Sequence, residues 1–130
     1  MFALDTNVLV RYLVQDDEHQ TQKVTAYVEA LTPNRPAFVS TVVLCELCWV
    51  LKSAYGASRL DCATAIEAVL EVPVFQFEDF ELCHNAVKSF RLGSADFSDF
   101  IIREIAMSAG CEGIKSFDKK ALREAEFSTL

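Results

Sequence analysis

The chain has 130 residues, the length of one globular domain, and we expect a single domain over residues 1–130. Hydrophobic residues make up 52% of it, with only 4 Gly and 3 Pro, which excludes the disordered and low-complexity classes. The formal net charge is −7, so binding to a nucleic acid would need a local basic patch or bound cations.

Apolar runs and cysteines favour a cytoplasmic protein. The longest apolar run, residues 42–51, is interrupted by Glu46 and is shorter than the roughly 20 residues of a membrane-spanning helix. The N-terminal residues lack the basic and apolar regions of a signal peptide. The five cysteines are an odd number and lie mostly in helical patterns, which favours a reducing compartment. Cys45 and Cys48 form a CxxC, but no second pair or Gly/Pro turn accompanies it.

Short apolar runs alternate with helical spacing along the chain. Capping residues mark several helix boundaries: Ser40 or Thr41 and Ser58 precede helical patterns, and Gly56 follows one. Short strands between helices predict an α/β fold with a mainly parallel sheet. The expected strands lie over residues 1–4, 37–39, 74–77 and 113–117, and the expected helices over residues 7–13, 16–31, 40–56, 58–71, 78–90, 96–109 and 118–127.

Asp5 and Asp118 each follow a predicted strand directly. Parallel α/β sheets bind ligands outside the carboxyl ends of their strands, so both carboxylates would share one rim if the first and last strands are parallel neighbours. Each also has a structural interpretation, because Asp is a favoured N-cap residue.

Asp96 and Asp99 open a predicted helix three residues apart. They fit a variant of the capping box, in which both carboxylates serve only the helix terminus. Residues at this spacing also share one helix face, so both side chains could point at a common ligand. The sequence leaves the two interpretations open.

Glu46 is the only charged residue in the apolar run of residues 42–51. A helix buried on most sides would carry this carboxylate inward, where it must find a cation or become protonated. A buried Lys or Arg partner and a solvent-facing position are the structural alternatives.

The four acids are more informative together than singly. If Asp5, Glu46, Asp99 and Asp118 converge, their like charges raise one another's pKa unless a cation neutralises them. Oxygen ligands without His or Cys favour Mg²⁺ or Mn²⁺ over zinc. Such an ion suits phosphoryl chemistry, because it polarises a phosphoryl oxygen and activates bound water.

Four segments resemble the PIN-domain ribonucleases, and more narrowly the small toxins of the VapC type from toxin–antitoxin pairs. The segments are FALDTNVLVRYL, VSTVVLCELCWVL, SADFSDFIIREIAMSAGC and IKSFDKKAL, and their order and spacing cover nearly the whole chain. The resemblance implies a three-layer α/β/α sandwich around a short, mainly parallel sheet. It also implies metal-dependent endonucleolytic cleavage of RNA, a homodimer, and an antitoxin whose tail occupies the acidic pocket.

The resemblance assigns roles to individual residues of this chain. Asp5, Glu46, Asp99 and Asp118 match the catalytic acids, and Asp5 and Asp99 match the direct metal ligands. Auxiliary or hydrogen-bonding roles fall to the residues that neighbour them in sequence: Thr6, Asn7, Asp96 and Ser116. The RNA target is not implied, although transfer RNA is a common substrate in this family.

Lys119 and Lys120 directly follow a candidate catalytic acid and are candidates for holding RNA phosphates. An ordinary solvated helix face is the alternative for both. Two further functions compete with the nuclease: a PIN-like module whose acidic pocket only binds a partner, and redox chemistry at Cys45 and Cys48. Retention of all four acids argues against the inactive module.

Overall fold

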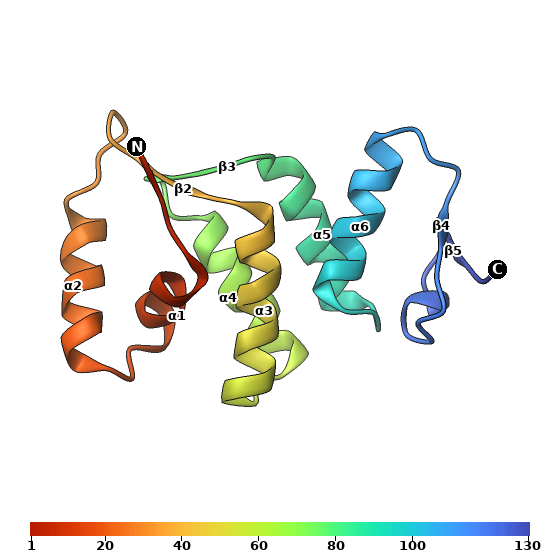
Figure 1. The fold of residues 1–130 in the computed structure, drawn as a ribbon, viewed down its shortest axis with the longest axis horizontal. Coiled ribbons are helices and arrows are strands. Elements are labelled where there is room, and N and C mark those ends of the chain that lie inside the picture. Colours follow the sequence, from red (N-terminus) through yellow and green to blue (C-terminus); the bar gives the residue numbers. More distant parts are fainter. The chain divides into compact units, whose positions relative to one another are not determined.

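The computed structural model describes all 130 residues, which form two compact units, residues 1–80 and residues 81–130 (Figure 1). Each unit is described by itself below. None of the helices has both the length and the apolar character needed to cross a membrane.

The first unit is built on a three-stranded parallel sheet. Its strands are β1 (Phe2–Ala3), β2 (Ala37–Val39) and β3 (Phe75–Phe77), in the order β1-β2-β3. Ala37 of the central strand pairs with a residue of each neighbour. Both Ala37 and Val39 are completely buried, as expected for a central strand of a parallel sheet covered by helices.

Four helices complete this unit: α1 (Thr6–Val14), α2 (Glu18–Glu29), α3 (Thr41–Tyr55) and α4 (Arg59–Leu70). Each begins at a residue whose side-chain oxygen accepts a hydrogen bond from a backbone N–H of the first turn: Asp5, Asp17, Ser40 and Ser58 respectively. These caps satisfy N–H groups that have no partner within the helix. Helix α3 packs against both α1 and α4 (Figure 1).

The orientation of α3 determines where its acidic residue points. Leu44, Leu47 and Leu51 are buried, whereas Val42 and Trp49 are exposed. The helix is therefore apolar on both its buried and its exposed faces.

The second unit contains α5 (Phe80–Leu92), α6 (Phe97–Ser108), a short 3₁₀ helix η1 (Ala121–Arg123) and the parallel strands β4 (Ile114–Lys115) and β5 (Phe127–Ser128). Three buried phenylalanines join its two α-helices. The ring centroid of Phe90 lies 5.8 Å from that of Phe97 and 6.5 Å from that of Phe100, both in edge-to-face arrangements. This cluster anchors the first turn of α6.

The sequence predicted the α/β class, the six α-helices up to residue 109 and the first four strands, and the structure confirms them. The predicted helix over residues 118–127 is wrong. In its place stand the single turn η1 and β5, which was not expected.

Strand pairing explains this error. The backbone N–H groups of Ile114 and Ser116 donate to the carbonyl oxygens of Glu126 and Ser128, at 2.8 and 3.0 Å. These bonds to a strand 12 residues away prevail over the local helical spacing. The shared rim for Asp5 and Asp118 was expected only if the first and fourth strands are neighbours in one sheet. In the structure β1 pairs with β2 and β4 pairs with β5, in separate sheets, so that condition is not met.

Candidate metal centre

Three carboxylates of the second unit lie close together. One carboxylate oxygen from each of Asp96, Asp99 and Asp118 lies within 4.8 Å of the others. Asp96 and Asp99 are half-buried, and Asp118 is exposed. Separations of this size suit a small divalent ion held between oxygen ligands.

The start of α6 positions two of these side chains. Asp96 is the residue that precedes the helix, and its backbone N–H donates to Oδ2 of Asp99 at 3.0 Å. Phe97 and Phe100 are buried on the other side of this turn. The two carboxylates therefore share the face that points away from the phenylalanine cluster.

A tight turn after β4 positions Asp118. Its Oδ1 accepts hydrogen bonds from the backbone N–H groups of Lys120 and Ala121, at 2.8 and 3.3 Å. Its own backbone N–H donates to Oγ of Ser116 at 3.0 Å. The predicted auxiliary residue Ser116 thus supports the turn rather than a carboxylate. Oδ2 of Asp118 accepts no hydrogen bond and is available to a ligand.

The electrostatics of this cluster favour a cation. Burial raises the pKa of the Asp99 carboxyl above its ordinary value, and the negative charges of Asp118 and Asp96 add to the increase. The hydrogen bond from the Asp96 backbone and the positive charge of Lys120 act in the opposite direction, but the net change is upward. The donor set contains only carboxylates, so it fits Mg²⁺ or Mn²⁺.

Glu124 was not predicted from the sequence, yet it ties the two acidic segments together. Its Oε1 accepts from the backbone N–H of Ser94 at 2.8 Å and from the Ser94 hydroxyl at 3.3 Å. Ser94 lies two residues before Asp96, and Glu124 lies six residues after Asp118. The Ser94 backbone bond, the largest of several hydrogen-bond contributions, lowers the pKa of the Glu124 carboxyl.

The lysines near this cluster differ in their surroundings. Lys119 and Lys120 are both exposed in the turn that leads to η1. Of the two, Lys120 acts electrostatically on Asp99. Their contact with RNA stays a prediction.

The other two predicted catalytic acids belong to the first unit. Oδ1 of Asp5 accepts from the backbone N–H of Thr6 at 2.8 Å, so Asp5 caps α1. The Thr6 hydroxyl donates to Oε2 of Glu46 at 2.7 Å. Thr6 is only 7% exposed, and it is the one buried polar residue of the chain. A buried hydroxyl thus fixes the position of the Glu46 side chain relative to α1.

Glu46 is exposed, so the solvent-facing position, one of the alternatives that the sequence left open, is the one observed, and the inward position is not. Apolar residues occupy both the buried and the exposed face of this helix, so the sequence did not show which face is buried. Glu46 lines an open groove of about 380 Å³ between α1 and α3. The other lining residues are Asp5, Thr6, Asn7, Val10, Arg11, Val50, Ala54 and Tyr55.

A hydrogen-bonded cluster at the far end of this groove also escaped the sequence analysis. Nη1 of Arg11 donates to Oδ1 of Asp16 at 2.8 Å and to the Tyr55 hydroxyl at 3.2 Å. The Tyr55 hydroxyl in turn donates to Oδ2 of Asp16 at 2.9 Å. The available signal was that Arg11 is the only charged residue of α1.

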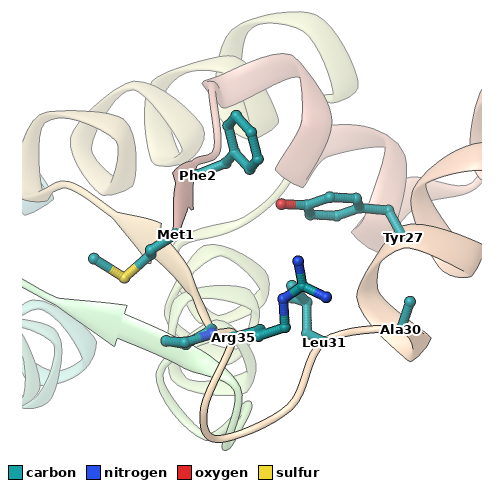
Figure 2. Close-up of a pocket in the computed structure, with 7 residues that line it drawn as sticks. Met1, Phe2, Tyr27, Ala30, Leu31 and Arg35 are labelled. Carbon is teal, nitrogen blue, oxygen red and sulfur yellow. The ribbon is translucent and has the colours of Figure 1, made fainter.

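A second pocket, of about 240 Å³, lies beside β1 and α2 (Figure 2). Phe2, Tyr27 and Leu31 form much of its wall, and Arg35 extends along it. It contains no carboxylate, so it is not a candidate metal site.

The second cysteine of the CxxC is poorly placed for redox or zinc chemistry. Cys48 is buried, and burial raises the pKa of its thiol to about 12, which keeps it protonated and unreactive. Its contact is with Cys62 on α4, whose thiol donates to the Cys48 carbonyl oxygen. No disulfide bond joins any of the five cysteines.

A parallel sheet flanked by helices and a carboxylate cluster at a helix start define an α/β protein with a candidate divalent-metal site. A sequence model of the PIN domain matches residues 2–127. The chain therefore belongs to the PIN-domain family. It is also similar to the VapC ribonuclease of Aquifex aeolicus (strain VF5), with 26% identity over 131 residues that cover 100% of this chain and 96% of the relative.

Proposed function

We propose that this chain is a metal-dependent endoribonuclease and acts as the VapC-type toxin of a type II toxin–antitoxin pair. The observation that carries the proposal is the close approach of the Asp96, Asp99 and Asp118 carboxylates in a member of the PIN-domain family. A relative named VapC ribonuclease that matches the whole chain supports the choice of RNA as substrate. The single family match over residues 2–127 supports one domain over residues 1–130.

The proposed catalytic acids are Asp5, Glu46, Asp99 and Asp118, with Asp5 and Asp99 as direct ligands. When bound, Mg²⁺ or Mn²⁺ supplies the positive charge that polarises the scissile phosphate and favours ionisation of water. In the second unit, the free Oδ2 of Asp118 and the raised pKa of Asp99 support a role in holding that charge.

The remaining polar residues have positioning roles in this proposal. Thr6 holds Glu46 by its 2.7 Å hydrogen bond, and Ser116 supports the turn at Asp118. Asn7 lines the same groove as Asp5, and Asp96 adds a third carboxylate to the cluster of the second unit. Lys119 and Lys120 are proposed to contact RNA phosphates, because both are exposed beside Asp118.

Partners follow from the same proposal. An antitoxin whose arginine enters the acidic pocket would inhibit the enzyme, because a guanidinium can bond the carboxylates that a metal ion otherwise neutralises. We also propose a cytoplasmic homodimer that cleaves cellular RNA, with transfer RNA as one candidate substrate.

The test is cleavage of RNA by purified, antitoxin-free protein with added metal. We expect endonucleolytic products with Mg²⁺ or Mn²⁺, none in EDTA, and a loss of at least about 100-fold in Asp99→Asn. Asp61→Asn is the matched control, because Asp61 stands at the same first-turn position of α4 as Asp99 in α6. Protein that binds Mn²⁺ but leaves every RNA pool intact would instead be an inactive binding module.

A further inference from the structure

The groove between α1 and α3 has two chemically different ends. Asp5 and Glu46, both hydrogen-bonded to Thr6, lie at one end, and the hydrogen-bonded pair Arg11 and Tyr55 lies about two turns further along α1. Asp5 and Arg11 are six positions apart, which corresponds to about 9 Å along the axis of α1, so one RNA strand could contact both. Between the ends, Val10, Val50 and Ala54 supply an apolar wall.

Hydrogen bonds hold the Arg11 end of the groove in one conformation. Besides its bonds to Asp16 and Tyr55, Arg11 donates from Nε to Oε1 of Gln20 at 2.6 Å. The Tyr55 hydroxyl is both a donor and an acceptor in this cluster, so its ring cannot swing away without breaking two bonds. Tyr55 is nevertheless 39% exposed, which leaves ring surface free.

The charges at this end argue against a phosphate ligand. The ion pair between Arg11 and Asp16, at 2.8 Å, leaves no net positive charge there. Asp17 lies nearby, and Asp5 and Glu46 add negative charge at the other end. A phosphate would be repelled, whereas a neutral, flat ligand would find an apolar wall, an aromatic ring and the unbonded Nη2 of Arg11.

We propose that Tyr55 and Arg11 bind a nucleobase of the RNA strand near the cleaved phosphate. The base stacks on the Tyr55 ring, and Nη2 of Arg11 donates to one of its acceptor atoms. Any base can stack on an aromatic ring, so this subsite increases RNA affinity and fixes the position of the strand, but it adds little sequence preference. The inference rests on the proposed nuclease function, to which it adds a substrate-binding subsite.

The test measures the Kd of single-stranded RNA for proteins that carry Asp99→Asn, so that the RNA is not cleaved. In each RNA, one nucleotide within three positions of the cleavage site is replaced by an abasic residue. The loss of affinity caused by this replacement is then compared between Tyr55 variants. At one position, we expect the abasic change to weaken binding by about fivefold to 150-fold. With Tyr55→Leu that penalty should disappear, whereas Tyr55→Phe, which keeps the ring but loses both hydroxyl bonds, should retain most of it.

Tyr27→Leu is the matched control, because Tyr27 has a similar exposure, 37%, but lines the other pocket. It should leave the abasic penalty unchanged. Ala54→Leu is a second variant in case Tyr55→Leu unfolds, since it fills the groove without touching the Arg11 hydrogen bonds. It should weaken binding of intact RNA and spare the abasic RNA.

Equal weakening of intact and abasic RNA by Tyr55→Leu and by Ala54→Leu would overturn the subsite. This result is distinct from failure of the proposed function, which appears as wild-type protein that cleaves no RNA with added metal. If the wild type cleaves RNA but the abasic penalty does not depend on Tyr55, the base subsite is rejected and the proposed nuclease function stands.

Discussion

The acids of the two units are stabilised in different ways. In residues 81–130, three carboxylates crowd within 4.8 Å, and the pKa of Asp99 is raised by burial and by its neighbours. In residues 1–80, Asp5 caps α1, and a buried hydroxyl donates to Glu46. Hydrogen bonds are common to both groups, because Asp118 also accepts two from the backbone. What distinguishes residues 81–130 is the crowding of three carboxylates, whose mutual repulsion a cation would relieve. This crowding supports Asp96, Asp99 and Asp118 as candidate ligands beside the proposed ligand Asp5.

The largest expected effect is on metal affinity. Asp118→Asn should weaken Mn²⁺ binding by about 10- to 100-fold, because it removes one of three clustered charges. Glu46→Gln should weaken it by less than about threefold, since the Thr6 hydroxyl can still donate to the amide oxygen. Calorimetric titration with Mn²⁺ compares the two. An equal loss in both variants would remove the distinction between the acidic groups.

The next largest expected effect is a loss of RNA cleavage when the Thr6 hydroxyl is removed. Thr6→Val removes the donor to Glu46 but keeps the buried volume, so we expect RNA cleavage to fall by about tenfold. Unfolding free energy should fall by about 1 kcal/mol. Thr6→Ser keeps the hydroxyl and should retain most of the activity. Activity measured in parallel with urea denaturation separates positioning of Glu46 from loss of fold.

Glu124 tests how the clustered acids are held. Glu124→Ala removes the acceptor for Ser94 and should destabilise the protein by about 1 kcal/mol. Because the folded state lowers the pKa of this carboxyl, its contribution is present above the unfolded value of about 4.3 and is lost as pH falls further. Urea denaturation of wild type and variant between pH 3 and pH 7 measures it. A difference in stability that grows toward low pH would contradict this role.

The smallest expected effect is that of Asp99→Asn on the thermal stability of the metal-free protein. Its pKa is raised in the folded state, so its negative charge destabilises the metal-free protein at neutral pH. Asp99→Asn should therefore raise the midpoint of thermal unfolding by about a few degrees, and the gain should vanish below about pH 4, where Asp99 is protonated in both states. Thermal denaturation in EDTA measures this, and a lower midpoint for the variant would show that its charge stabilises the fold.

The features that could be predicted from the sequence depend on residues close together in the chain. Asp5 and Asp96 were recognisable because each precedes a helix, where a capping residue is expected, and the structure confirms both caps. The pairing of Asp96 with Asp99 followed from their spacing on one helix face. The parallel pairing of β1, β2 and β3 within the first unit also agrees with the predicted sheet.

The features missed depend on contacts between distant residues. Glu124 and Ser94 are 30 residues apart, and Arg11 and Tyr55 are 44 apart, so no local pattern joins them. The sequence could not decide between an inward and a solvent-facing Glu46, because α3 presents apolar residues on both faces. Strand β5 was not predicted, because its residues follow a helical spacing. Its pairing with β4, a contact between distant residues, determines the structure instead.

The central claim is that the carboxylates of Asp96, Asp99 and Asp118 hold a divalent ion. A crystal soaked in Mn²⁺ tests it most directly, because the anomalous signal of manganese locates the ion independently of the protein phases. We predict a peak within coordination distance of these carboxylates, lost in Asp99→Asn crystals treated in the same way. At saturating Mn²⁺, a peak elsewhere or no peak at this cluster would contradict the account.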